Sequence, residues 1–221
     1  MKKWTLRLVA VVGLITFALA AYTGKGWYDA RADAPNLRER AKILAVQGLG
    51  ADALGPEKRA VLLKVEDPSF YHNNGIDFSS PGAGKTTITQ SLSKRLAFEK
   101  FEPGIRKLRQ TGYAVGLNQS LSKDDVLTLF LAESSFRGSD RRWTKSFDAA
   151  SRRFFGKPLA VLDSKSFALM VASGIAPNEM APDAPNAKLL ERVVRIERLV
   201  SGKCKASSYD DVWLEGCAVK R

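Results

Sequence analysis

The 221-residue sequence contains one histidine and two cysteines, and this scarcity excludes the usual protein metal centres. Zinc and the transition metals are held by clusters of His, Cys and carboxylate ligands. Cys204 and Cys217 lie near the C-terminus, far in sequence from His72. We therefore expect no such metal site. In an oxidising compartment the two thiols would close a short disulfide loop, and the alternative is two free thiols.

The sequence also lacks the alternation of apolar and polar residues that is typical of half-buried strands, and it lacks internal repeats. Apolar residues recur at helical spacing instead. The predicted helices cover residues 36–46, 56–65, 87–98, 105–119, 126–132, 146–155, 164–173 and 186–200. Three prolines within residues 177–185 predict a loop. The sequence predicts a mainly α fold.

A complete nucleotide-binding loop is absent, although residues 82–87 read Gly-Ala-Gly-Lys-Thr-Thr. The phosphate-binding pattern requires a glycine five residues before Gly84, and Ser79 occupies that position. No hydrophobic strand leads into the segment. We therefore do not expect a nucleoside triphosphatase.

Acidic residues are outnumbered, with 23 Asp and Glu against 35 Lys and Arg, which gives a net charge of +12. Removing the three cations of the first seven residues leaves +9, so the excess belongs to the folded part. A basic protein favours nucleic acid, an anionic membrane or phosphorylated ligands, and charge does not choose among them. The 45% hydrophobic content and the length fit one folded domain.

The longest hydrophobic run covers residues 8–22 and follows those three cations. A cationic flank before an apolar run is typical of a secretory signal or an uncleaved signal anchor. The run extends back to Trp4 if Arg7 snorkels to the membrane surface. We predict that residues 1–25 are a transmembrane anchor, with cleavage near residues 18–20 as the alternative. Either outcome places the domain outside the cytoplasm and argues against nucleic acid as a partner.

Two segments carry most of the chemistry. Residues 66–77 place Glu66 and Asp67 beside Phe70 and the histidine, and apolar neighbours can raise a carboxyl pKa toward neutrality, as a general base requires. The following segments add hydroxyl, amide and cationic groups, namely Thr86, Thr89, Gln90, Lys94, Arg106 and Lys107. This combination suggests a sugar hydroxyl that is activated against a phosphate leaving group.

These segments resemble the peptidoglycan glycosyltransferases of family 51, found in bifunctional penicillin-binding proteins and monofunctional transglycosylases. Residues 66–77 match Glu-Asp-x-x-Phe-x-x-His-x-Gly-x-Asp, and residues 84–92 resemble Gly-x-Ser-Thr-Ile-Thr-Gln-Gln-Leu. Lys94 matches the lysine that follows. Arg106-Lys107 match the opening of the third motif, and residues 154–157 are similar to Tyr-Phe-Gly-Lys. The resemblance covers roughly residues 55–200.

The resemblance implies a lysozyme-like domain, here residues 26–201, that polymerises a lipid-linked disaccharide (lipid II) and releases polyprenyl pyrophosphate. Glu66 would be the general base. Substrate-binding positions would be Asp67, Thr86, Thr89, Gln90, Lys94, Arg106 and Lys107, and structural motif positions would be Phe70, His72 and Gly75. We expect His72 to be a hydrogen-bonded structural residue. The resemblance also implies lipid II, nascent glycan, the bacterial inner membrane and other cell-wall synthesis proteins as partners, an extracytoplasmic domain, and a divalent cation (Mg²⁺ or Mn²⁺) as a candidate cofactor.

Three polar positions depart from the family pattern. Gln110 occupies the place of the second catalytic glutamate, Ala132 that of an asparagine, and Ser166 that of another glutamate. An amide cannot ionise, and the loss of one acid–base group typically costs about 10² to 10⁴ in rate. Two hypotheses follow: slow or specialised transfer by Glu66 and the basic cluster, or an impaired relative that binds lipid II or glycan as a scaffold. Glu133 is a candidate substitute acid. The tail, residues 202–221 with the two cysteines, has no family counterpart.

Overall fold

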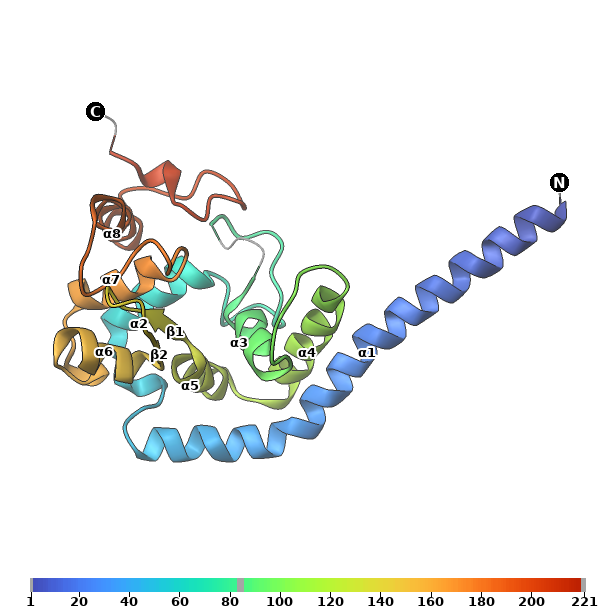
Figure 1. The fold of residues 1–221 in the computed structure, drawn as a ribbon, viewed down its shortest axis with the longest axis horizontal. Helices are drawn as coiled ribbons and strands as arrows, with labels where there is room; N and C mark the ends of the chain where they lie inside the picture. Colours follow the sequence, from blue (N-terminus) through green and yellow to red (C-terminus); the bar gives the residue numbers. More distant parts are fainter. Residues whose placement is uncertain (1, 83–85, 220–221) are drawn as a thin grey trace.

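The computed structural model describes residues 2–82 and 86–219 and shows a mainly helical chain (Figure 1). Its helices are α1 (Lys2–Val46), α2 (Gly55–Glu66), α3 (Ile88–Leu96), α4 (Arg106–Ser120), α5 (Lys123–Glu133), α6 (Phe147–Phe155), α7 (Ser164–Ser173) and α8 (Ala187–Val200). Short 3₁₀ turns lie at Ala51–Leu54 (η1), Leu159–Val161 (η2) and Glu215–Cys217 (η3). The predicted mainly α fold class is therefore confirmed.

The structure also contains two short strands that the sequence pattern did not reveal. Strand β1 (Ser135–Arg137) pairs with β2 (Trp143–Lys145) as an antiparallel hairpin, with Phe136 opposite Thr144. Each strand has only three residues, which is too short for an alternating pattern to stand out in the sequence. The hairpin joins α5 to α6, with Phe136 buried and Ser135 exposed.

Helix α1 is continuous from the predicted anchor through the predicted helix at 36–46, with Pro35 inside it. Figure 1 shows the helix changing direction in its second half, as expected near a proline that cannot donate a backbone hydrogen bond. Its most apolar 18-residue window has a mean hydropathy of 2.0 and none of it is buried, so α1 is long and apolar enough to cross a membrane. This helix is consistent with the predicted membrane anchor.

The part of α1 that follows the apolar run packs directly on α4 through glycine. A Cβ atom added to Gly112 would lie 2.0 Å from the carbonyl oxygen of Thr23, and one added to Gly26 would lie 2.2 Å from that of Arg109. Such backbone contact is possible only where side chains are missing. Polar bonds reinforce the crossing: the Tyr113 hydroxyl donates to Asp33 (2.6 Å), and Arg109 pairs with Asp29 (2.8 Å). The anchor helix and the domain therefore form one rigid piece here.

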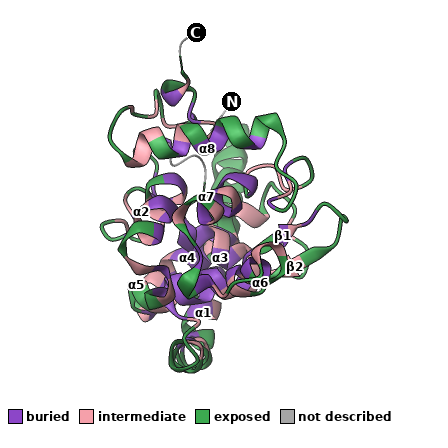
Figure 2. Cartoon of the chain, turned by 90° about the vertical axis from the view of Figure 1, so that its left-hand side faces the viewer, coloured by how far each residue is buried: buried purple, intermediate pink, exposed green. Residues whose placement is uncertain are grey.

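The core lies at the middle of the domain, where Figure 2 shows buried residues gathered around α3, α4 and α7. Helix α5 is apolar around most of its circumference and is buried from Val126 to Leu131, as expected for a central helix. The ring of Phe147 contacts those of Phe136 and Phe167, with centroids 4.7 and 5.6 Å apart. This core fixes the ends of α2, α3, α7 and β1 around a common space.

Candidate active site

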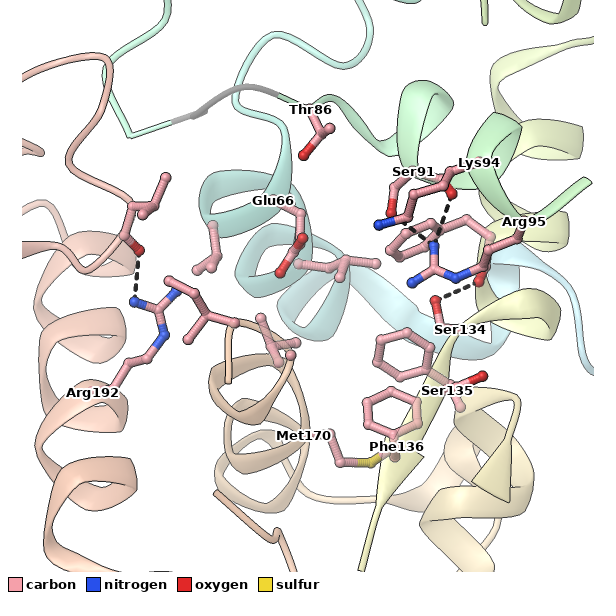
Figure 3. Close-up of a pocket in the computed structure, with 18 of the residues that line it drawn as sticks. Glu66, Thr86, Ser91, Lys94, Arg95, Ser134, Ser135, Phe136, Met170 and Arg192 are labelled. Carbon is pink, nitrogen blue, oxygen red and sulfur yellow. Dashed lines mark hydrogen bonds between the residues drawn. The ribbon is translucent and has the colours of Figure 1, made fainter. Parts of the chain in front are cut away.

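A cavity of about 290 Å³ lies where α2, α3, α7, α8, β1 and the C-terminal tail meet (Figure 3). Its polar wall includes Glu66, Thr86, Ser91, Lys94, Arg95 and Arg192. Its apolar wall includes Leu62, Phe130, Phe136 and Met170. Among the residues that the structure describes, Glu66 is the one acidic side chain on this wall.

Glu66 is the last residue of α2 and is half-buried at the cavity. Within residues 2–82 and 86–219 its carboxylate has neither a hydrogen bond nor a direct ion pair, although it feels the charges of Arg192 and Arg95. Burial raises the pKa of Glu66, and the two guanidinium groups oppose that rise. A partly buried carboxylate that makes no hydrogen bond or ion pair with the described residues can accept a proton from a ligand.

Cations face this carboxylate from two sides. In Figure 3, Glu66 lies between Arg192, on α8, and the pair Lys94 and Arg95, on α3. The Arg95 guanidinium donates a hydrogen bond to the Ser91 hydroxyl (2.7 Å), and its central carbon lies 5.6 Å from the centroid of the Phe130 ring. Burial lowers the pKa of Lys94, and the charge of Arg95 lowers it further. The cavity therefore joins one base to a concentration of positive charge.

Arg192 has no counterpart among the predicted site residues, although the sequence held a signal for it. Leu189, Val193 and Ile196 form the buried stripe of the amphipathic helix α8, and Arg192 stands in the middle of that stripe. A charged residue on an apolar stripe is rarely fully buried unless it has a partner or a function. Its side chain is 4% exposed and donates to the carbonyl oxygen of Val212 at 2.7 Å.

Asp67, adjacent to Glu66, is directed away from the cavity into a buried hydrogen-bond network. Its carboxylate accepts from the backbone N–H of Ile88 (3.0 Å) and from the Asn73 amide (2.8 Å), so it ties the first motif to the start of α3. Burial is the main cause that raises its pKa to about 6. The geometry gives Asp67 a positioning role for the loop beside Glu66 rather than a place on the cavity wall.

The raised pKa of Asp67 predicts a specific pH dependence of stability. The folded carboxyl, with its pKa of about 6, binds a proton more tightly than the unfolded one, with a pKa of 3.8, so stability falls as the pH rises between these values. We expect the free energy of unfolding of wild type, relative to Asp67→Asn, to decrease by roughly 2 kcal/mol from pH 4 to pH 7. Urea unfolding at a series of pH values measures this. An Asp77→Asn control, which removes a carboxyl with a lowered pKa, should not reproduce it in that window. A pH-independent difference between wild type and Asp67→Asn would contradict this assignment.

The second motif divides between the cavity and the protein interior. Thr86 is exposed at the cavity wall. Thr87 and Gln90 form a reciprocal capping box at the start of α3, in which the Thr87 hydroxyl accepts from the Gln90 N–H and the Gln90 side chain accepts from the Thr87 N–H. Thr89 and Gln90 are both buried and do not line the cavity.

Gln110 is fully buried on α4 and does not line the cavity. Its Nε2 donates to the backbone carbonyl oxygen of Gln90 at 2.7 Å, and its Oε1 has no hydrogen-bond partner among the described residues. The side chain therefore links α4 to α3 beneath the second motif. Glu66 and Gln110 are not brought together on the cavity wall.

The two cations at the start of α4 also lie off the cavity wall. Arg106 donates to the carbonyl oxygen of Lys100 (2.7 Å) and is 3.6 Å from a carboxylate oxygen of Glu102. Burial lowers the pKa of Lys107, with a further contribution from the charge of Lys94. Lys107 therefore extends the positive field of the cavity, whereas Arg106 stabilises the turn before α4.

Comparison with known proteins gives the chain a family. A sequence profile of the family described as Transglycosylase matches residues 79–200. The chain belongs to this transglycosylase family. Glu66, at the end of α2, lies just before the matched residues.

Individual relatives agree with this membership. The chain is 27% identical to penicillin-binding protein 1F of Bacillus subtilis over 171 residues, which are 72% of this chain and 23% of that protein. It is 25% identical to a biosynthetic peptidoglycan transglycosylase of Rhodospirillum centenum over 159 residues, 66% of this chain and 67% of that protein. A biosynthetic peptidoglycan transglycosylase of Citrobacter koseri is 27% identical over 162 residues, 67% of this chain and 65% of that protein. The chain thus spans under a quarter of the penicillin-binding protein and about two thirds of the transglycosylases.

The other positions of the first motif, residues 66–77, serve the fold in different ways. Phe70 is buried, and the Lys123 ammonium lies 4.9 Å from its ring centroid. Gly75 has a φ of 88°, and an added Cβ would lie 2.6 Å from the carbonyl oxygen of Ala114, so only glycine fits there. The expectation of a hydrogen-bonded His72 side chain does not hold: the side chain is exposed, and among the described residues only its backbone N–H is bonded, to Ser69 (2.7 Å). The turn at 69–72 needs the backbone of His72 and leaves its imidazole in solvent.

Glu133, the candidate substitute acid, already forms two ion pairs. It is 5% exposed and pairs with Arg40 and with Lys145, the latter at 2.6 Å. Burial acts to raise the pKa of Glu133, but the hydrogen bonds and charges of these two cations lower it below its ordinary value. A doubly paired carboxylate off the cavity wall is a structural bridge between α1, α5 and β2 rather than an acid–base group.

A divalent cation, which the family resemblance implied as a candidate, has no fitting ligand set in the described part of the chain. Mg²⁺ and Mn²⁺ prefer several oxygen ligands. No group of three or more His, Cys, Asp or Glu side chains gathers among residues 2–82 and 86–219, and the cavity wall offers Glu66 amid cations. The segment resembling a nucleotide-binding loop includes Gly84, which lies outside the described residues.

Proposed function

We propose that this transglycosylase-family chain is a membrane-anchored peptidoglycan glycosyltransferase that polymerises lipid-linked disaccharides outside the cytoplasm. The observation that carries the proposal is the half-buried Glu66 carboxylate, uncommitted among the described residues and facing Lys94, Arg95 and Arg192 across a cavity. Family membership and the apolar helix α1 support it. Its partners would be lipid II, the growing glycan, the bacterial inner membrane and other cell-wall synthesis proteins.

The proposed reaction joins two sugars with inversion at the anomeric carbon. The 4-hydroxyl oxygen of one disaccharide forms a bond to the anomeric carbon of another, and the bond from that carbon to the pyrophosphate oxygen breaks. Glu66 takes the hydroxyl proton as the bond forms. The polyprenyl pyrophosphate leaves with the electron pair, and nearby cations stabilise its negative charge.

The cation set that supports this step differs from the one that the sequence predicted. Arg95 and Lys94 are on the cavity wall, and a guanidinium can bind a phosphate through two parallel hydrogen bonds. Lys107 adds positive field from α4. Thr86 and Ser91 bring hydroxyls to the same wall, where they can donate to phosphate or sugar oxygens.

A second candidate function is a binding or scaffolding module that holds lipid II or glycan without polymerising it. The cavity wall of the described residues has one carboxylate, and Gln110 is buried beneath α3, where it cannot reach a ligand in the cavity. A site with a base but no second acid would transfer slowly. The two functions are separated by supplying lipid II to the full chain in detergent and measuring glycan product and binding. Product supports the enzyme, and saturable binding without product supports the scaffold.

The position of Gln110 predicts the result of restoring the family glutamate. Gln110→Glu would remove the donor to the Gln90 carbonyl and place a buried carboxyl against it, so we expect a loss of stability of about 1 to 3 kcal/mol. We expect no gain in polymerisation rate, because the side chain does not line the cavity. Denaturant unfolding and the polymerisation assay measure the two effects, with Gln110→Met as the shape-matched control that should lose less stability. A large gain in rate for Gln110→Glu would contradict this placement.

A further inference from the structure

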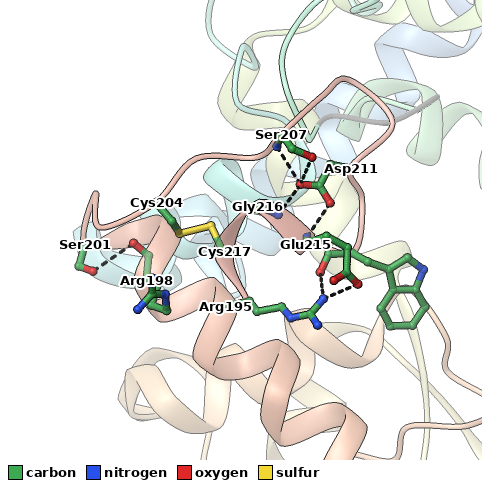
Figure 4. The surroundings of a disulfide bond; sticks show 10 residues. Arg195, Arg198, Ser201, Cys204, Ser207, Asp211, Glu215, Gly216 and Cys217 are labelled. Carbon is green, nitrogen blue, oxygen red and sulfur yellow. Dashed lines mark hydrogen bonds and ion pairs between the residues drawn. A yellow bond between two sulfur atoms is a disulfide. The ribbon is translucent and has the colours of Figure 1, made fainter. Parts of the chain in front are cut away.

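The C-terminal tail, residues 202–219 in the structure, contributes to the wall of the cavity. Figure 4 shows it folded back over the end of α8, where the Cys204–Cys217 disulfide joins its two ends. These are the only cysteines of the chain. Val212, at the middle of the tail, lines the same cavity as Glu66.

One carboxylate organises the tail. Asp211 is 7% exposed and accepts hydrogen bonds from the backbone N–H groups of Ser207 (2.8 Å), Glu215 (2.6 Å) and Gly216 (3.0 Å). The Ser207 hydroxyl donates to it as well, at 3.0 Å. The loop within the disulfide is therefore a compact, internally bonded unit, and its surfaces can hold other groups in fixed positions.

The tail bridges two parts of the site. On one side, the Arg195 guanidinium pairs with Glu215 at 2.6 Å and donates to the carbonyl oxygen of Trp213 at 3.0 Å. On the other side, the Tyr209 hydroxyl donates to the carbonyl oxygen of Asp77 (3.1 Å). The backbone N–H of Gly82 donates to the carbonyl oxygen of Ser208 (2.9 Å). The tail therefore connects α8 to the loop between the first and second motifs.

Arg192 bonds to the tail and lines the same cavity as Glu66, the proposed base. Its guanidinium donates to the Val212 carbonyl at 2.7 Å and lies 5.4 Å from the Trp213 ring, so two consecutive tail residues fix its direction. Its Nε has no hydrogen-bond partner among the described residues although it is buried. Burial is the main cause that lowers the pKa of Arg192, to about 10, so it is charged at neutral pH.

We propose that Arg192 is a positioning residue for Glu66, held in place by the disulfide-closed tail, and that Val212 closes that end of the cavity against the substrate. The inference rests on the proposed function of Glu66. Through its charge Arg192 favours the ionised carboxylate, which is the form that accepts a proton. The tail is then part of the active centre. Breaking the disulfide would free Val212 to leave the cavity wall and remove the restraint on Arg192.

The other charged groups around Glu66 are few in the described part of the chain. Lys94 and Arg95 face it from α3, and the cavity residues contributed by α5, β1, α6 and α7 carry no charge. Asp211 acts on Arg192 from the tail, and Glu133 acts on Arg95 from α5. The tail therefore affects the Glu66 carboxyl through the charge of Arg192. A substitution of Arg192 alone tests this effect.

The first test follows the Glu66 carboxyl directly and does not depend on catalysis. The full chain is labelled with ¹³C-glutamate in detergent micelles, and the Glu66 resonance is the one that Glu66→Gln lacks. We expect its pKa to rise in Arg192→Gln, to return toward wild type in Arg192→Lys, and to rise in Cys204→Ser/Cys217→Ser or after reduction of wild type. An unchanged pKa in Arg192→Gln and in the reduced protein would overturn the proposal.

The second test uses polymerisation of lipid II, with kcat and KM measured separately. We expect reduction to lower kcat/KM of wild type by about tenfold or more, which corresponds to about 1.4 kcal/mol of transition-state stabilisation. The Cys204→Ser/Cys217→Ser variant should show the low value with and without reductant, and Lys203→Ala, an exposed change just before the disulfide loop, should behave as wild type. A tail that only stabilises the fold would lower the melting temperature and leave kcat/KM unchanged below it, and that result would overturn the proposal. If wild type makes no glycan, the proposed function fails, while the ¹³C titration still decides the role of Arg192.

Discussion

Glu66→Gln is expected to slow glycan synthesis severely while leaving lipid II binding intact. The amide keeps the shape of the side chain at the cavity wall but cannot take the proton of the attacking hydroxyl. We expect the polymerisation rate to fall by about 10² to 10⁴, the usual contribution of one general base. Binding should change little, because cations at the same wall still meet the pyrophosphate.

A matched control comes from the same helix. Glu57 lies in the first turn of α2, is exposed and accepts a hydrogen bond from the Ser164 hydroxyl at 2.7 Å, outside the cavity. Glu57→Gln should polymerise at the wild-type rate. Rates from fluorescent lipid II, with circular dichroism to verify folding, make the comparison. Full activity in Glu66→Gln would remove Glu66 from the mechanism.

Gly112→Val is expected to have the largest effect on stability. An added Cβ would lie 2.0 Å from the carbonyl oxygen of Thr23 and 3.2 Å from the backbone nitrogen of Trp27, so α1 must move away from α4. Both obstacles are backbone atoms, which cannot rotate aside as a side chain can. We expect a loss of at least about 3 kcal/mol, at the upper end of the range for overpacked sites.

The matched control is Gly24→Ala on the facing helix, where nothing lies within 4 Å of an added Cβ. Alanine in an open helical position should stabilise the protein by about 0.5 to 1 kcal/mol. Thermal unfolding in detergent measures both variants. If Gly112→Val were as stable as wild type, α1 and α4 would not cross in backbone contact, and the anchor would not be rigidly joined to the domain.

The helices of this protein were predictable because apolar spacing records which face of each helix is buried. The predicted helix at 126–132 shows this: its apolar residues are the buried ones of α5, which begins three residues earlier after the Ser122 cap. The β1–β2 hairpin was not predictable, because its pairing depends on a turn and on packing rather than on a repeating pattern. The continuity of α1 through Pro35 depends in turn on its contacts with α4 and α5.

The candidate site was only partly predictable for a related reason. Glu66 and Lys94 were found because their motifs are local in sequence, and both lie on the cavity wall. Thr89 in the second motif and Gln110 in the third face the interior instead, since one face of a motif helix must be buried to hold the other in place. Arg192 could have been suspected from its place on the apolar stripe of α8, but no sequence pattern predicts that the tail folds back and brings Val212 to the cavity.

The pH dependence of kcat/KM for lipid II polymerisation by the wild-type chain tests the central claim most directly. Burial raises the pKa of Glu66, and activity requires its ionised form, so kcat/KM should fall as the pH decreases through a value above the ordinary pKa of glutamate. The same apparent pKa should appear in the ¹³C titration of the Glu66 carboxyl. An acid limb at the ordinary glutamate value or below, or none at all, would contradict a half-buried Glu66 acting as the base.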